Sequence, residues 1–138
     1  MTRITRLEFS AESGPGSRMQ WNHRGSGHVQ VTVAGPDVFF QEAFTLDNGL
    51  PCQDRKCWHF GAEGIIFRHF REQRFQDILL LVPDTSGIHL VAQAPYACPP
   101  DRYDGSLSLR DGTLELRLRI TGARKDEDIR YRYRADPG

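Results

Sequence analysis

The stretch TLELRLRITGARKDEDIRYRYR, residues 113–134, constrains the fold more than any other part of the chain, because apolar and charged side chains alternate along it almost without a break. Alternation with a period of two is typical of a strand that buries one face, and two such runs around a short polar segment predict an antiparallel hairpin. The apolar set comprises Leu114, Leu116, Leu118, Ile120, Ile129, Tyr131 and Tyr133. The opposite face carries Arg117, Arg119, Arg130, Arg132 and Arg134. We expect the apolar set to face inward and the arginines to face outward.

The pairing of these arginines depends on where the turn lies. A turn centred on residues 124–125 puts Arg119 opposite Arg130 and Arg117 opposite Arg132. Like charges that face each other directly destabilise a sheet, so we expect these arginines to find acidic partners only in part. Three interpretations stay open: a solvated outer face, a patch that meets an anion or nucleic acid, and an inverted register in which the arginines line a cavity.

Short strands and turns continue through the rest of the chain, with turn signals such as Asn-Gly at 48–49 and Asp-Gly at 111–112. The second signal predicts a hairpin that places Asp104 opposite Arg119. Together with the turn at GARKDED it makes 103–109, 113–121 and 128–134 consecutive antiparallel neighbours. Residues 63–82 could form a helix, but their apolar spacing slips at Phe75, so two strands with a break at REQ are favoured.

These patterns predict about nine or ten strands and little helix. We predict an all-β fold, a single antiparallel up-and-down barrel formed by one domain over residues 1–138, because closure removes exposed strand edges. A two-sheet sandwich is the alternative.

Composition limits the classes of function. The chain has 138 residues, with 18 basic and 18 acidic side chains, so no global field attracts nucleic acid. No apolar run is long enough to span a membrane, and the N-terminal segment lacks the apolar core of a signal peptide, so we expect a cytoplasmic protein. Three cysteines, an odd number, indicate free thiols.

The apolar face also carries tyrosines, at positions 103, 131 and 133. A buried tyrosine hydroxyl needs a hydrogen-bond partner. The interior of a barrel with about eight strands or slightly more is either filled by side chains or holds one small ligand. Inward-pointing tyrosines are compatible with both arrangements.

Glu42 is the sharpest candidate for a buried charge. In the segment FFQEAFTL it shares a face with Phe40, so it enters the interior if that face is inward and must then be paired or protonated. Arg55 is one conceivable partner. The strand could equally face inward through Phe39 and Ala43, which would leave Glu42 in solvent.

Two C-terminal segments, CPPDRYDGS at 98–106 and TGARKDED at 121–128, resemble the signature of a known family. The residues that carry the resemblance are Cys98, Asp101, Tyr103, Gly105, Gly122, Arg124, Lys125, Asp126, Ile129 and Tyr133. They look like the C-terminal pattern of an uncharacterised bacterial and fungal family, the domain of unknown function numbered 6314. Upstream, Glu42, Arg55 and HFREQRF at 69–75 are similar to further elements of that family, so the resemblance runs from about Gly27 to Arg134.

The chain departs from the family pattern at several positions. Tyr96 stands where the family tends to have His, Ala123 where it has Pro, and Cys57 where it has Tyr. The resemblance implies a small lipocalin-like β-barrel and no established activity.

Asp101 lies across from Gly122 when the strands are counted back from the Asp-Gly turn, which brings it toward Arg124 and Lys125. An ion pair there would clamp the proline-containing loop to the last hairpin. The same cations could instead meet a ligand carboxylate or phosphate at the mouth of a cavity.

Metal and catalytic chemistry find little support. Cys52, Cys57 and His59 form a C-x4-C-x-H pattern to which Cys98 could add a ligand, but the spacing is not that of a standard zinc knuckle. No nucleophile is paired with a base. We predict no metal and no cofactor, and we recognise no catalytic constellation; an enzyme that acts on a bound small molecule ranks behind the two hypotheses below.

Two hypotheses remain. The first is a barrel that binds a small apolar or amphipathic molecule with an anionic end near Lys125 or Arg124. The alternative is a structural or interaction module with a filled barrel and an arginine-rich outer face; a homodimer is compatible with either. The candidate ligand-binding residues are Glu42, Arg55, Asp101, Tyr103, Arg124, Lys125, Tyr131 and Tyr133.

Overall fold

The computed structural model describes residues 4–17, 22–87 and 89–135, and in these ranges every regular element is a β-strand. The strands are β1 (Ile4–Ser13), β2 (His23–Ala34), β3 (Asp37–Leu46), β4 (Pro51–Phe60), β5 (Ile65–Arg71), β6 (Arg74–Pro83), β7 (His89–Ala92), β8 (Tyr96–Cys98), β9 (Asp101–Arg110), β10 (Thr113–Thr121) and β11 (Asp126–Ala135). Among the described residues, no helix has the length and apolar character needed to cross a membrane.

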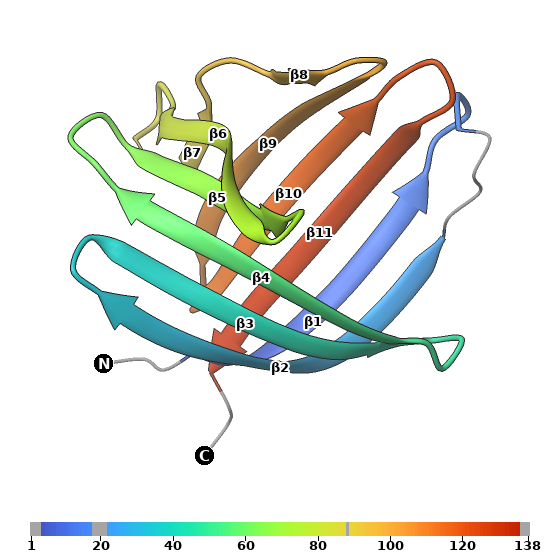
Figure 1. The fold of residues 1–138 in the computed structure, drawn as a ribbon, viewed down its shortest axis with the longest axis horizontal. Helices are drawn as coiled ribbons and strands as arrows, with labels where there is room; N and C mark the ends of the chain where they lie inside the picture. The colour runs from blue at the N-terminus through green and yellow to red at the C-terminus, as the bar shows by residue number, and fades with distance from the viewer. Residues whose placement is uncertain (1–3, 18–21, 88, 136–138) are drawn as a thin grey trace.

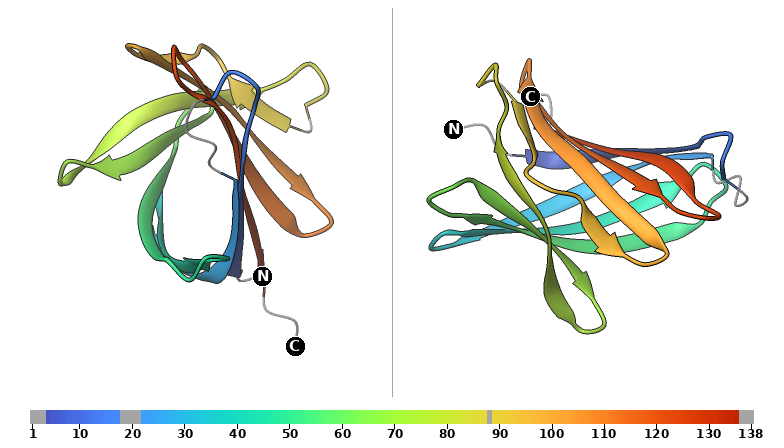
Figure 2. Two further views of the ribbon diagram at one scale, coloured as in Figure 1. Left: turned by 90° about the vertical axis from the view of Figure 1, so that its right-hand side faces the viewer. Right: turned by 90° about the horizontal axis from the view of Figure 1, so that it is seen from above.

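All strand pairs are antiparallel, and the sheet closes on itself. Its order is β10-β11-β1-β2-β3-β4-β5-β6-β7-β9, and β9 pairs with β10 to complete a ten-stranded barrel. The short strand β8 is an eleventh strand that pairs only with β9. Figures 1 and 2 show β1 to β4 and β9 to β11 enclosing a common interior. The predicted all-β barrel is confirmed, and the sandwich alternative is wrong.

The hairpins around β10 have the predicted connectivity but not, in one case, the predicted register. β9, β10 and β11 are consecutive antiparallel neighbours, with Asp104 opposite Arg119 as expected. On the other side of β10, however, Arg119 pairs with Asp128, and Arg117 pairs with Arg130. The expected pairing was wrong by two residues because the turn is centred one position earlier, where Gly122 N–H donates to the Lys125 carbonyl.

This register supplies acids to the arginine face. Carboxylates lie within 4.0 Å of all five arginines, in the pairs Arg117–Asp128 (2.8 Å), Arg119–Asp126 (2.8 Å), Arg130–Asp128 (3.7 Å), Arg132–Glu115 (2.9 Å) and Arg134–Glu8 (3.3 Å). The expectation of only partial pairing was therefore wrong. The arginines do face outward as predicted, so the inverted register is excluded.

Residues 63–82, for which a helix was the alternative prediction, contain the β5–β6 hairpin. Glu72 and Gln73 form its tip with φ values of 52° and 65°, between the paired residues Arg71 and Arg74. Two consecutive residues with positive φ are typical of the type I′ turn, whose twist matches that of antiparallel strands.

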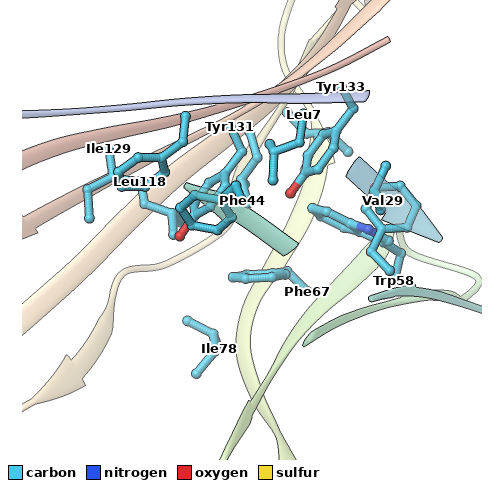
Figure 3. Packing of buried hydrophobic residues seen from close by; sticks show 14 of the residues in the cluster. Leu7, Val29, Phe44, Trp58, Phe67, Ile78, Leu118, Ile129, Tyr131 and Tyr133 are labelled. Carbon is cyan, nitrogen blue, oxygen red and sulfur yellow. The ribbon is translucent and has the colours of Figure 1, made fainter. Parts of the chain in front are cut away.

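The barrel interior holds one core of aliphatic and aromatic side chains. The apolar set of β10 and β11 belongs to it, with Leu116 and Tyr133 both 0% exposed. Figure 3 shows these strands facing Phe44, Trp58 and Phe67 on the opposite wall. The predicted inward face of the C-terminal hairpin is confirmed.

Candidate functional site

A cluster of polar side chains lies inside the barrel, although its surroundings are apolar. The interior polar cluster consists of Glu42, Asp54, Lys56, His69 and Tyr133, contributed by β3, β4, β5 and β11. Glu42 is 1% exposed and Lys56 is 0% exposed. A charge buried to this degree has to be paired and hydrogen-bonded.

Strand alternation aims these side chains inward. On β3, Phe40, Glu42, Phe44 and Leu46 are buried while the residues between them are exposed. On β4, Lys56 lies opposite Phe40 of β3 and His69 of β5, so all three share the inner face. Glu42 therefore points inward, and the alternative face through Phe39 and Ala43 is wrong.

Lys56 is the centre of the interior polar cluster. Its Nζ donates to Oε1 of Glu42 at 2.6 Å and to Oδ2 of Asp54 at 3.0 Å. It also lies 3.5 Å from the centroid of the Tyr131 ring, a cation–π contact. The second Glu42 oxygen accepts the hydroxyl of Tyr133. Every donor direction of the ammonium is thus met from inside the protein.

The hydrogen bonds continue from Asp54 to the neighbouring strand β5. The second Asp54 oxygen lies 2.6 Å from Nε2 of His69, and Nδ1 of His69 accepts from Nε of Arg71 at 3.2 Å. Nδ1 of His69 therefore faces the guanidinium of Arg71, and Nε2 faces the carboxylate of Asp54. One continuous chain of hydrogen bonds therefore links Arg71 to Tyr133.

Burial and pairing act in opposite directions on the titratable groups. Burial raises the pKa of Asp54, but the hydrogen bond from His69 and the charge of Lys56 outweigh it and lower that pKa to about 2. Burial lowers the pKa of Lys56, yet the surrounding negative groups hold it above its usual value. Burial raises the pKa of Tyr131 to about 12. Lys56 is therefore an ammonium ion at neutral pH and not a nucleophilic amine.

The expected partner of Glu42 was wrong. Arg55 points to the outer face of β4, where its guanidinium lies 5.2 Å from the centroid of the Phe70 ring, and the neighbouring Lys56 takes its place inside. The sequence QDRK offers charged residues on both faces of the strand. Its alternation therefore carried no signal for which face was buried.

The expected clamp at the C-terminal hairpin is present. Nζ of Lys125 lies 3.0 Å from Oδ2 of Asp101, so the Asp–Lys form of the predicted ion pair is confirmed. Tyr103 is half-buried, and the guanidinium of Arg71 lies 5.0 Å from its ring centroid. Arg124 is exposed in the turn between β10 and β11. Of the candidate residues, Glu42, Tyr131 and Tyr133 come together around Lys56, whereas Asp101 and Lys125 form a separate pair.

An apolar pocket opens at the end of the barrel where β2, β4 and β9 end and β3, β5 and β10 begin. Figure 1 draws the β2–β3 and β4–β5 turns of this end at the left. This mouth pocket has a volume of ≈690 Å³. It is lined by Ile4, Thr5, Val29, Gln30, Val31, Val33, Val38, Phe40, Trp58, Phe60, Ile65, Leu107 and Leu114. None of these described lining residues is charged. Arg124 and Lys125 lie at the opposite end of the barrel, by the β10–β11 turn.

The rim of the mouth pocket exposes large apolar side chains. Val33 is 68% exposed, Phe60 54% and the neighbouring Leu109 63%. Val29 and Phe40, deeper in the same pocket, are buried. The pocket was not predicted, because the alternation of HVQVTVA continues unchanged to the strand end and does not show that Val31 and Val33 extend beyond the packed core.

Trp58 forms part of the inner wall of the mouth pocket. Its ring packs against Phe40 and Phe67, with centroid distances of 5.7 and 5.1 Å. Its Nε1 is buried and has no hydrogen-bond partner; among the described residues, only Nδ1 of His89 shares this condition. Figure 3 shows the indole near Val29 and Phe67.

Other depressions lie on the outside of the barrel, and charged as well as apolar residues line them. One of them, of ≈720 Å³, runs over β11, β1, β2 and β3 and contains charged residues, including Glu8, Arg24, Asp47 and Arg130. Within the described ranges, no group of three or more His, Cys, Asp or Glu side chains could hold a metal ion. The mouth pocket differs from these depressions because no charged residue lines it.

The fold and its end pocket define a small closed antiparallel β-barrel. The chain belongs to the family of unknown function DUF6314, whose sequence profile matches residues 12–135. No curated protein matches the sequence. Among solved structures, a de novo designed fluorescence-activating β-barrel is similar with a TM-score of 0.52 and 12% identity, over 98% of this chain and 94% of the design. At that identity the similarity shows the fold alone.

Proposed function

We propose that the barrel binds a small, predominantly apolar molecule in the mouth pocket. The observation that carries this proposal is an open apolar cavity of ≈690 Å³, a volume within the range of about 300–1,000 Å³ in which proteins hold small ligands. Exposed Val33 and Phe60 at its rim would lose contact with water when the pocket is occupied.

Two further features support binding. The deeper barrel is filled by the core and the interior polar cluster, which together give the pocket a fixed floor. The similar designed barrel is described as fluorescence-activating, so this architecture is compatible with holding a small molecule. Binding inside a barrel, as lipocalin-like proteins do, is the function that we infer.

The arginine-rich outer face supports the alternative interaction role less well. Each of its five arginines has a carboxylate within 4.0 Å, so much of the positive charge is compensated within the protein. A surface compensated in this way offers less attraction to an anionic partner.

The test uses Nile red, a neutral dye that fluoresces in apolar surroundings, titrated with the purified protein. Phe60→Ser, which removes apolar contact at the rim, should weaken dye binding about fivefold or more. Leu50→Ser is the matched control, because Leu50 is also 54% exposed but lies in the β3–β4 turn at the other end of the barrel. It should leave the affinity unchanged.

Sedimentation measurements without dye accompany the titration. Dye binding that responds equally to both substitutions would place the site elsewhere and contradict the proposal. The proposal would also be wrong if the wild type bound no dye and Phe60→Ser abolished self-association, since the pocket would then be an interface between copies.

A further inference from the structure

We propose that a groove on the outer face of β2, β3 and β4 is a second binding site, which takes a small molecule whose carboxylate or phosphate group pairs with Arg55. This outer groove lies on the outside of the barrel, so the inference does not depend on what the mouth pocket holds. Arg55 is a candidate ligand-binding residue from the sequence that the structure separates from Glu42. The expected anionic site at Lys125 is less suitable, because Asp101 already neutralises that charge.

The outer groove follows from the strand register. Ala43 lies directly opposite His28 of β2 and Gln53 of β4, so a single methyl group stands between two longer side chains and leaves a hollow. The β5–β6 hairpin, which Figure 2 shows projecting from the barrel, contributes Phe70 to the lining. The groove has a volume of ≈470 Å³, which is within the range of about 300–1,000 Å³ for small-molecule sites.

The guanidinium of Arg55 is held in the outer groove by an aromatic ring. It lies 5.2 Å from the centroid of the Phe70 ring, a cation–π contact. Phe75 supports that ring, with centroid distances of 5.2 Å to Phe70 and 5.5 Å to Phe39. Within the described part of the chain, the guanidinium forms no ion pair and donates no hydrogen bond. Its five N–H donors are therefore available to a ligand.

The outer groove leaves this positive charge uncompensated. Its two acidic lining residues, Glu42 and Asp54, direct their carboxylates to Lys56 inside the barrel. On the arginine-rich outer face, by contrast, every arginine has a carboxylate within 4.0 Å. An anion at the outer groove therefore gains a charged partner without displacing an acid of the protein.

Two amides lie beside Arg55 and add neutral donors. Gln41 is directly opposite Arg55 on β3, and Gln53 precedes it by two positions on the same face of β4. Both side chains are exposed, and neither forms a hydrogen bond to a residue that the structure describes. Cβ atoms of directly opposite residues lie about 4.5–5.5 Å apart, so Arg55 and Gln41 can reach the same group. A fixed guanidinium with amide donors beside it suits the oxygens of a carboxylate or phosphate.

The experiment uses three probes that share a phenyl ring: benzoate, phenyl phosphate and benzyl alcohol. Chemical-shift titrations in ¹H–¹⁵N spectra at constant ionic strength give a dissociation constant for each probe, and the backbone signals of residues 41–43 and 53–55 locate the site. At the outer groove we expect at least one anion to bind about fivefold or more tightly than the alcohol, because only the anions pair with the guanidinium. The anion that binds more tightly identifies the preferred group as carboxylate or phosphate.

Two variants test the role of Arg55. Arg55→Gln should weaken the preferred anion about tenfold, because hydrogen bonds from a charged donor are lost. The matched control is Arg102→Gln, an exposed arginine on β9 that also lacks an ion pair among the described residues, and its effect should be less than about twofold because distant charges are screened. Gln41→Glu places a carboxylate opposite Arg55, so it should retain the fold and weaken the anion about tenfold or more by pairing with Arg55 itself.

Three outcomes would overturn the inference. These are equal losses of anion affinity in Arg55→Gln and Arg102→Gln, equal binding of the alcohol and the anions at the outer groove, and signals of residues 41–43 that do not respond to either anion. The proposed function is tested separately, because Arg55→Gln should bind Nile red as tightly as the wild type does. A negative result with the anions would therefore leave binding in the mouth pocket intact.

Discussion

The hydroxyl of Tyr133 on β11 donates to Oε2 of Glu42 on β3, between positions separated by 91 residues in the chain. In the sheet these two strands are not neighbours, because β1 and β2 lie between them. The hydrogen bond therefore crosses the barrel interior, and Lys56 completes the contact from β4. Four predictions follow from this interior hydrogen bond, from the two faces of the sheet and from the packing of its strands.

Lys56→Met should destabilise the protein by about 3–5 kcal/mol, because it leaves the buried Glu42 carboxylate without its cation. The matched control is Lys125→Met, which breaks the more exposed ion pair with Asp101 and should cost less than about 1 kcal/mol. Urea denaturation at pH 7 measures both. Equal losses for the two variants would show that burial of the Lys56–Glu42 pair has no energetic consequence.

Acid stability should depend on Asp54. Its pKa is lowered to about 2 from 3.8, so between about pH 4 and pH 2 the unfolded chain binds more protons than the folded protein. The stability that Asp54 contributes is therefore present above pH 4 and is lost as the pH falls toward 2. We expect Asp54→Asn to reduce the loss of unfolding free energy over this interval by about 2 kcal/mol. If the unfolding free energy of Asp54→Asn falls between pH 4 and pH 2 as steeply as that of the wild type, Asp54 is not the source of this pH dependence.

The outward arginines should be dispensable for folding. Replacing Arg117 and Arg132 together with Gln should change the unfolding free energy by about 1 kcal/mol or less, because both side chains lie on the outer face in partly exposed ion pairs. Leu116→Ala, on the buried face of the same strand, should cost about 2–5 kcal/mol through lost burial and a cavity. Thermal or urea denaturation measures both effects. A loss of several kcal/mol in the double Gln variant would show that these arginines are not dispensable for folding.

Gly27 should not tolerate a side chain. A Cβ at this position would lie 2.0 Å from the carbonyl oxygen of Ala43 and 2.5 Å from Cα of Phe44, both on the neighbouring strand β3. Gly27→Ala should therefore cost at least about 1–3 kcal/mol, since backbone atoms would have to move apart. Gly61→Ala is the control, because its nearest neighbour would be 3.7 Å away and its φ is not in the left-handed region. A similar melting temperature for both variants would contradict the close approach of β2 and β3.

Much of the architecture was predictable because it depends on local patterns. Alternation of apolar and charged residues between 113 and 134 specified which face of β10 and β11 is buried, as Leu116 and Arg117 show. The Asp-Gly turn set the β9–β10 register correctly, since a two-residue turn leaves little choice of pairing. The longer turn after β10 allowed a different centre, and the predicted pairing of Arg117 there was wrong.

The sequence by itself thus determined the strands, their C-terminal order and the burial of Tyr131 and Tyr133, because each follows from neighbours along the chain. Only the tertiary structure decided that Lys56, and not Arg55, meets Glu42, because QDRK is charged on both faces and pairing with β3 and β5 selects the inner one. The presence of the mouth pocket also depends on the tertiary structure. The pocket lies at the strand ends where Val31 and Val33 extend past the packed core. The relative positions of these strand ends depend on the pairing of β9 with β10 that closes the barrel. This pairing is a long-range contact, which the local alternation of residues does not encode.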